Sequence, residues 1–254
     1  MFGPGKTFLE KDLQDWHVDC WSWLMRWGAR HRAIDYTSLI LPTPQFFPKS
    51  GAEGHARAVH IFNTVKRLAG MEEWPAKLIQ QERIQRELGP MQHVEHGRTC
   101  AGTFSQRDNT ALITYDPDKL KQPVHLVATF AHELGHYFLY GFPVLIQPRE
   151  MEEHATDVST IYLGFGLFGA NTALNFRQHG GFDGWSTQRL GYLSEAEWVF
   201  GLAMFGALSG DGVERMKDHL KPTMWGEVKR AAKIIERDGL AEKARAQATA
   251  RSKR

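Results

Sequence analysis

The sequence predicts an α+β fold that is mostly helical with one small sheet. Apolar residues recur at spacings of three and four along several stretches, which is the pattern of amphipathic helices. Two short β-rich runs, 99–104 and 110–115, flank the polar segment 105–109, an arrangement typical of a hairpin. The chain has 254 residues, 42% of them hydrophobic and 24% charged, which is the composition of an ordinary globular domain.

Before the hairpin, three helices are expected. The first covers 12–27, carries a heavily aromatic face and ends at Gly28. The second covers 52–69 and has Gly70 as its C-cap. A third is predicted over 75–88, before a Gly-Pro pair that would close it.

After the hairpin, a helix is expected over 123–140, with its proline in the first turn where a missing N–H does no harm. A further helix is predicted over 149–168 and another over 194–208. Ser194 can act as N-cap of the last one, because Glu197 three residues later completes a capping box.

These elements divide the chain into three regions of one compact domain. Residues 1–90 form a helical N-terminal region packed on the core, 91–210 form the core that carries the chemistry, and 211–254 form a C-terminal helix with a basic tail. The apolar pattern shows no internal repeat that would divide the chain into copies.

Cysteine usage and the N-terminus indicate the compartment. Cys20 and Cys100 are far apart and form no CxxC pair, so neither a disulfide framework nor a thiolate-only zinc site is available. The first eleven residues lack the features of a secretory signal, and the apolar runs are too short to span a bilayer. We therefore expect a cytoplasmic protein with no membrane span.

The basic charge is concentrated at the C-terminus. Residues 214–254 contain 12 Lys and Arg against 6 Asp and Glu, although the net charge of the whole chain is only +2. This segment lacks aromatic interleaving and any recognised nucleic-acid module, so a solvated helix with a frayed tail is the expectation and nucleic acid is an unlikely partner.

The residues that carry chemistry are His-Glu-Leu-Gly-His, 132–136. On a helix, His132 and His136 at i and i+4 lie on one face, so both imidazoles can reach one metal ion. Glu133 is rotated enough to miss the ion yet touch a water molecule bound to it. The motif lies in the middle of a predicted helix directly after a β-rich segment, the context that metal-assisted hydrolysis requires.

A third ligand is available on the following predicted helix. Glu153 lies 17 residues beyond His136, and Asp157 lies four residues later on the same helix face. Two histidines and one glutamate give three protein ligands, which leaves a fourth position for water or substrate.

In these residues the chain resembles the gluzincins, zinc peptidases with HExxH on one helix and a glutamate ligand on the next. The pattern Glu, two variable residues, a small residue and Asp is matched by Glu153, Thr156 and Asp157. The resemblance covers about 110–166 and implies a zincin-like fold with the small sheet beside the HExxH helix. The flanking regions look like those of small uncharacterised bacterial proteins with this motif, which adds no chemistry.

The resemblance also implies residue roles. His132, His136 and Glu153 would bind one Zn²⁺ per chain, Glu133 would be the general base, and Asp157 would hold a ligand imidazole in its tautomer. In gluzincins a Tyr or His after the motif commonly stabilises the oxyanion. The candidates here are Tyr140, Tyr162, His179 and Tyr192.

Alternative ligands remain open. Glu152 or His154 could replace Glu153, although only Glu153 has an Asp four residues later. Cys100 could act as in peptide deformylases, which combine HExxH with an upstream cysteine, but its neighbours do not match that family. His93 and His96 are more simply a solvated pair.

The expected function is a zinc metallopeptidase acting on a peptide or protein substrate, with the strand 110–115 forming the edge of the cleft and adding a substrate strand. The alternative is a non-proteolytic zinc-binding regulatory or sensor module on the same scaffold. Glu133 argues against that alternative, because a structural site has no use for a carboxylate poised beside the fourth ligand position.

Overall fold

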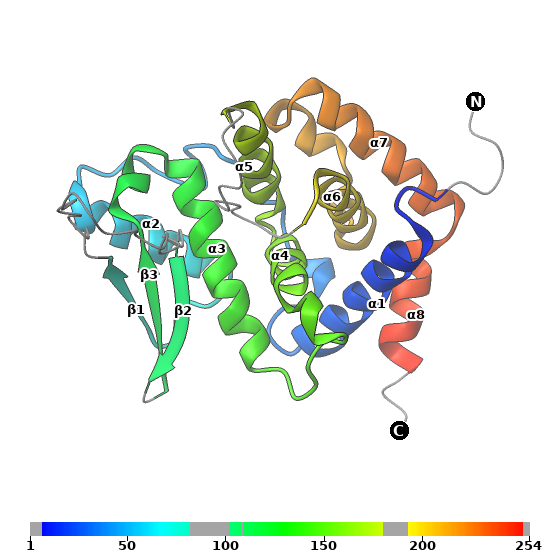
Figure 1. Cartoon of the computed structure of the whole chain (residues 1–254), viewed down its shortest axis with the longest axis horizontal. Helices are drawn as coiled ribbons and strands as arrows, with labels where there is room; N and C mark the ends of the chain where they lie inside the picture. Colours follow the sequence, from blue (N-terminus) through cyan, green and yellow to red (C-terminus); the bar gives the residue numbers. More distant parts are fainter. Residues whose placement is uncertain (1–6, 82–101, 108, 180–192, 251–254) are drawn as a thin grey trace, which may run out of the picture.

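The computed structural model describes residues 7–81, 102–107, 109–179 and 193–250, which form an α+β arrangement (Figure 1). The α-helices are α1 (Lys11–Gly28), α2 (Gly54–Leu68), α3 (Pro123–Tyr140), α4 (Glu152–Tyr162), α5 (Gly166–His179), α6 (Glu195–Ser209), α7 (Pro222–Arg237) and α8 (Leu240–Ala250). The strands are β1 (Ala76–Gln80), β2 (Gly102–Arg107) and β3 (Thr110–Tyr115). Short 3-10 helices are η1 (Ile34–Tyr36), η2 (Pro117–Lys121), η3 (Arg149–Met151) and η4 (Glu214–His219).

The sheet has the strand order β1-β3-β2 within the described residues. β2 and β3 form the expected antiparallel hairpin, and Asn109 beside its turn has a φ of 61°, a left-handed conformation that Asn tolerates. The expectation that 110–115 forms the edge of the cleft is wrong. β3 lies in the middle of the sheet, and β2 is the edge strand on the side of α3.

The predicted helix over 75–88 is also wrong where the structure describes it. Residues Ala76–Gln80 form β1, which pairs in parallel with β3 from Ala76 opposite Ala111 to Gln80 opposite Tyr115. The residue types of this run tolerate a helix, but pairing with a strand distant in sequence overrides such local preferences. Residues 82–88 lie outside the described part of the chain.

Helix α3 separates the sheet from the main helical body, as Figure 1 shows, with α2 and the strands on one side and α4 and α5 on the other. Most of its residues are buried, because it is covered on opposite faces. It begins with Pro123 in its first turn, as expected. None of the helices that the structure describes is long and apolar enough to cross a membrane.

The predicted helix over 149–168 is broken into α4 and α5. The break is at Gly164, whose φ is +94°. A Cβ at this position would lie 2.4 Å from the carbonyl oxygen of Ser38, and the Gly164 carbonyl accepts a hydrogen bond from Ile40 N at 3.0 Å. The chain turns here because a distant segment crosses it, which a local pattern does not reveal.

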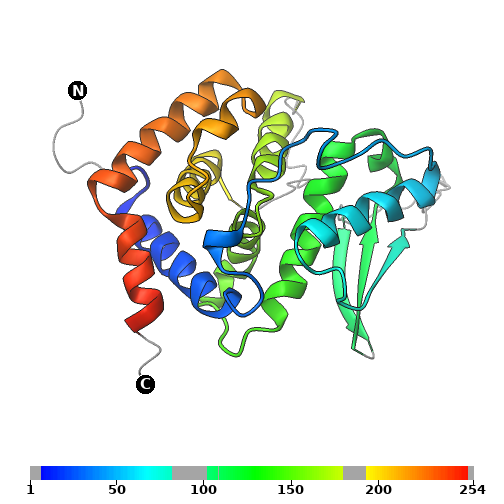
Figure 2. The same cartoon turned by 180° about the vertical axis from the view of Figure 1, so that it is seen from behind.

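The basic C-terminal segment is helical up to Ala250 and packs against α1, so a frayed tail is not found within the described residues (Figure 2). The Arg26 guanidinium donates to the carbonyl oxygens of Gln247 at 2.8 Å and Ala248 at 3.2 Å, which closes the C-terminal end of α8. Arg245 pairs with Asp35. Part of the basic charge is therefore used within the molecule.

Helix α6 is joined to α1 by a buried polar contact. Its capping box is present as predicted: Ser194 Oγ accepts from Glu197 N, and Glu197 Oε2 accepts from Ser194 N at 2.8 Å. Glu197 Oε1 also lies 3.4 Å from Nε2 of the fully buried His17. Burial raises the pKa of Glu197, but the hydrogen bonds with His17 and Ser194 outweigh it and lower the pKa to about 2.

Because burial lowers the pKa of His17, we expect a neutral imidazole that donates to an ionised Glu197. Glu197→Ala removes this bond and half of the capping box, so it should lower the free energy of unfolding by about 3 kcal/mol. Ser194→Ala, which removes the cap alone, should cost about 1 kcal/mol. Urea denaturation of both variants tests this. Equal losses would show that the contact with His17 contributes nothing.

Candidate metal centre

Helix α3 presents both histidines of the motif toward α4. His132 and His136 are one turn apart, and their ring centroids are 4.8 Å apart. Both side chains are largely but not completely buried. The i and i+4 spacing therefore gives the shared helix face that the sequence predicts.

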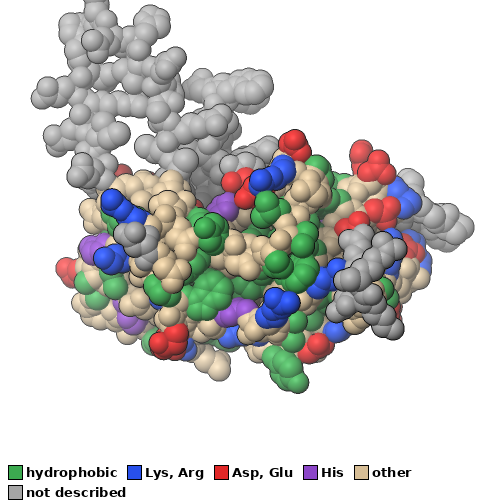
Figure 3. All heavy atoms as spheres, turned by 90° about the horizontal axis from the view of Figure 1, so that it is seen from below, with side chains coloured by type: hydrophobic (Ala, Val, Ile, Leu, Met, Phe, Trp, Pro, Cys, Tyr) green, Lys and Arg blue, Asp and Glu red, His purple; other side chains and the backbone are tan. Residues whose placement is uncertain are grey.

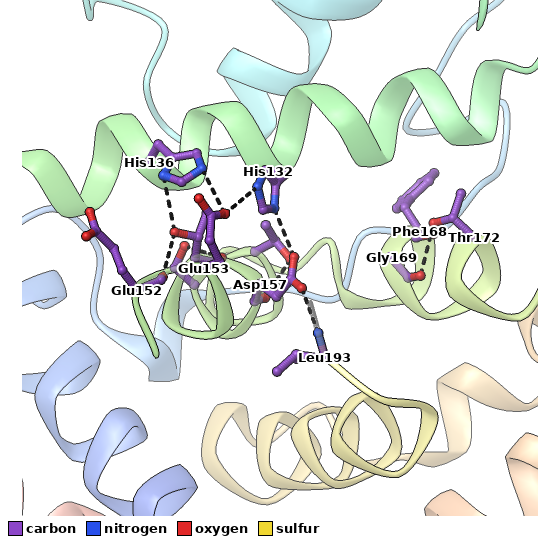
Figure 4. Close-up of polar contacts among 12 residues, drawn as sticks. His132, His136, Glu152, Glu153, Asp157, Phe168, Gly169, Thr172 and Leu193 are labelled. Atoms are coloured by element: carbon purple, nitrogen blue, oxygen red, sulfur yellow. Dashed lines mark hydrogen bonds and ion pairs between the residues drawn. The ribbon is translucent and has the colours of Figure 1, made fainter. Parts of the chain in front are cut away.

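Helix α4 supplies the third group (Figure 4). Glu153 Oε2 lies 3.3 Å from His132 Nε2 and 3.4 Å from His136 Nε2. Potential ligand atoms of these three residues all lie within 4.8 Å of one another. Among the described residues, this is the group of His, Cys, Asp or Glu side chains that could hold a metal ion.

The other nitrogen of each imidazole is tied to α4. His132 Nδ1 lies 2.9 Å from Asp157 Oδ1, and His136 Nδ1 lies 3.3 Å from the Thr156 hydroxyl oxygen. Since the Thr156 hydroxyl donates to the Glu152 carbonyl at 3.0 Å, its oxygen is left to accept from His136. In this assignment both Nδ1 atoms carry hydrogen, which leaves the two Nε2 atoms that face Glu153 as the positions from which the imidazoles could bind a metal ion.

Asp157 is itself held by a second element. It is buried, and its Oδ2 accepts a hydrogen bond from Leu193 N at 3.1 Å. Leu193 immediately precedes Ser194, the N-cap of α6. The carboxylate that orients His132 is thus fixed between α4 and the start of α6 (Figure 4).

The carboxylates make this a site for positive charge. Burial lowers the pKa of His132, but the hydrogen bonds with Asp157 and Glu153 outweigh it and raise the pKa to about 10. Burial raises the pKa of Glu153, but the hydrogen bonds and charges of the two histidines lower it by more. The pKa of Glu153 is therefore well below its usual range. Both shifts indicate that a cation between these groups is favoured.

Glu133 lies with its carboxylate against the start of β2. Its side chain is 5% exposed, and burial raises its pKa while His132 and His136 partly offset that effect. A Cβ added at Gly102 on β2 would lie 2.9 Å from Glu133 Oε1 and 2.7 Å from Thr129 Cγ2. The glycine at the start of β2 therefore leaves the space that the Glu133 carboxylate occupies.

Gly135 is a site residue that the sequence reasoning missed. A Cβ added there would lie 2.8 Å from Ser159 Oγ and 3.2 Å from the Thr156 carbonyl oxygen on α4. Only a residue without a side chain allows the two helices to approach so closely. The signal was present, because a glycine in the middle of a predicted helix usually has a packing reason. The sequence pattern likewise used Thr156 only as a small residue and did not predict that its hydroxyl contacts His136.

The alternative ligands on α4 point elsewhere. The Glu152 side chain is 57% exposed and lies near Arg149 rather than the histidines. The His154 ring makes an edge contact with Trp16 of α1. Glu153 is the residue of this run whose carboxylate reaches both imidazoles.

Of the candidate oxyanion donors, Tyr162 lies in the core. It is fully buried, and its hydroxyl donates to the Arg32 carbonyl at 2.7 Å. Tyr140 is 64% exposed at the end of α3. His179 ends α5, but its side chain is not described. The remaining donor candidate, Tyr192, lies outside the described residues, as do the alternative metal ligands Cys100, His93 and His96.

Phe104 of β2 forms the wall of the site on the sheet side. Its ring is stacked on His136 with 6.2 Å between centroids, and it also contacts the rings of Tyr137 and Tyr140. The edge strand and the C-terminal half of α3 thus meet through aromatic side chains next to the histidines.

Comparisons with known proteins do not assign the chain to a family: no family model matches it, and no curated protein or solved structure matches it either.

Proposed function

We propose that the protein is a zinc-dependent metallopeptidase. The observation that carries the proposal is the convergence of two imidazole nitrogens and one carboxylate oxygen. Tetrahedral zinc with bonds of about 2.0–2.1 Å separates its ligand atoms by roughly 3.3–3.4 Å. Glu153 Oε2 lies 3.3 and 3.4 Å from the two Nε2 atoms, so these two separations fit such an ion, and potential ligand atoms of all three residues lie within 4.8 Å of one another.

The chemistry of the donors supports zinc and leaves one position open. Imidazole nitrogen and carboxylate oxygen are ordinary zinc ligands, and three protein ligands are typical of catalytic rather than structural sites. Zinc would supply a Lewis acid that polarises the substrate carbonyl and lowers the pKa of a water molecule.

Within this proposal Glu133 is the general base. It accepts the proton of the attacking water and then delivers it to the nitrogen of the leaving amine, so no net proton is consumed by the side chain. Burial against Gly102 keeps the carboxylate from turning away.

The substrate would bind along β2. This strand pairs with β3 on one side, so its other edge is free to pair with an added strand as far as the described residues show. Gly102 lies next to Glu133 and Phe104 next to His136. A peptide paired with β2 would therefore run beside both the base and the metal ligands.

The enzyme and the non-proteolytic zinc module differ in their need for Glu133. Glu133→Gln keeps the size of the side chain, so zinc should be retained while peptide cleavage falls by about 100- to 10,000-fold. Glu152→Gln is the matched control, because Glu152 is exposed and faces away from the histidines. Zinc content and cleavage of a peptide library are the measurements. Equal rates in wild type and Glu133→Gln would exclude this mechanism.

Asp157 should control zinc affinity without binding the metal. Asp157→Asn preserves the shape but removes the charge beside His132, so the zinc dissociation constant should rise by about 10- to 100-fold in a competition titration with a chelator. Asp211→Asn is the control, since Asp211 also accepts a backbone N–H, that of Leu39, in another part of the fold. An unchanged affinity in Asp157→Asn would remove Asp157 from the site.

Gly135 should control the same affinity through helix packing. Gly135→Ala forces α4 away from α3, which separates Glu153 from the histidines, so we expect zinc affinity to fall by at least about tenfold. Gly226→Ala on α7 has open space for the methyl group and should leave zinc affinity unchanged. Wild-type affinity in Gly135→Ala would mean that the helix contact does not position Glu153.

A further inference from the structure

We propose that Phe104 and Tyr140 form a subsite that selects an apolar substrate side chain at one fixed position beside the cleaved bond. The inference rests on the proposed peptidase function and adds its specificity. We call these two residues the aromatic shelf. Their rings are in contact, with 6.2 Å between centroids, and Phe104 is also stacked on the imidazole of His136.

The aromatic shelf is unusual because its rings are only partly buried. Tyr140 is 64% exposed, while Phe104 is half-buried. Large hydrophobic side chains that are exposed among the described residues are few, and three of them fall close together directly after the HExxH motif. These three are Tyr140, Val144 and Leu145. These exposed side chains are neighbours in the sequence, and apolar patches on a protein surface commonly mark binding sites.

The location of the shelf indicates its occupant. Phe104 is stacked on a proposed metal ligand, and within the described residues one edge of β2 is not paired with another strand. The two rings therefore lie beside a proposed metal ligand and at the strand along which a substrate would pair. Figure 3 views the molecule from the side on which α3 ends, and hydrophobic side chains are visible there among charged and polar ones. The occupant that fits is an apolar side chain of the substrate itself.

Strand geometry restricts the selection to one position. Residues directly opposite each other in paired strands place their side chains on the same face of the sheet. The substrate residue opposite Phe104 thus points toward α3 and the shelf. Its two neighbours lie beside Thr103 and Ser105, which are exposed on the other face. Gly102, two residues before Phe104, lies against the base Glu133, so the selected position is close to the cleaved bond.

The test measures binding as well as cleavage. Peptide hydroxamates that differ only in one side chain, Phe, Gly or Glu, are titrated against the zinc-loaded protein by calorimetry, and a peptide library is cleaved in parallel. Wild type should prefer Phe over Glu at a single position by at least about tenfold in both assays. The positions on either side should show no comparable preference.

Tyr140→Ser and Phe104→Thr should each reduce this preference by several-fold or more, while zinc content stays the same. Phe104→Leu, which keeps an apolar side chain, should retain it. Tyr36→Ser is the matched control, because Tyr36 is an aromatic residue that is 83% exposed on η1. Since Tyr140 is itself exposed, its variant is expected to fold normally.

The outcomes separate this inference from the proposed function. A preference at no single position, or one that survives in both Tyr140→Ser and Phe104→Thr, overturns the shelf while the peptidase stands. If no hydroxamate binds, acetohydroxamate included, and no peptide is cleaved, the proposed function fails and the shelf fails with it.

Discussion

The close packing of α3 on α4 at Gly135 is the constraint on which the candidate site depends. The histidines are on one helix and the carboxylate is on the other, so their separation is set by the distance between the helices. Ser159 Oγ and the Thr156 carbonyl oxygen occupy the space that a side chain at position 135 would need. The same approach brings Thr156 and Asp157 within hydrogen-bonding distance of His136 and His132. The absence of a side chain at position 135 thus allows the helix contact that aligns the three candidate ligands and the two residues, Thr156 and Asp157, that hold the imidazoles.

The two faces of α3 contact different elements, and each contact contributes different groups to the candidate site. One face meets α4, which contributes Glu153 and the groups that fix the imidazoles. The other meets β2, where Gly102 makes room for Glu133 and Phe104 covers His136. A helix covered on both sides is apolar along most of its length, and the HExxH motif contributes most of the polar side chains of α3. Asp157 also accepts a hydrogen bond from the backbone N–H of Leu193, so the start of α6 helps to hold the residue that orients His132.

The sequence predicted the parts of this arrangement that depend on local spacing. His132 and His136 are one helical turn apart, and Ser194 and Glu197 have the spacing of a capping box, so both could be found without a structure. Glu153 was selected over Glu152 and His154 through its spacing from Asp157, and its carboxylate is the one that reaches the histidines. These patterns are visible because each involves residues within a turn of one helix.

The parts that depend on distant contacts could not be predicted. Ala76–Gln80 became a strand because β3 is its partner, and the helix over 149–168 broke at Gly164 because Ser38 and Ile40 cross it. Tyr162 is not a donor at the site, because its hydroxyl donates to the distant Arg32 carbonyl.

The most direct test of the central claim is X-ray absorption at the zinc edge of the purified protein. It should show about one zinc per chain with only nitrogen and oxygen neighbours at about 2.0–2.1 Å and the scattering of two imidazoles. Absence of zinc, or a sulfur neighbour at about 2.3 Å, would contradict a site made by His132, His136 and Glu153.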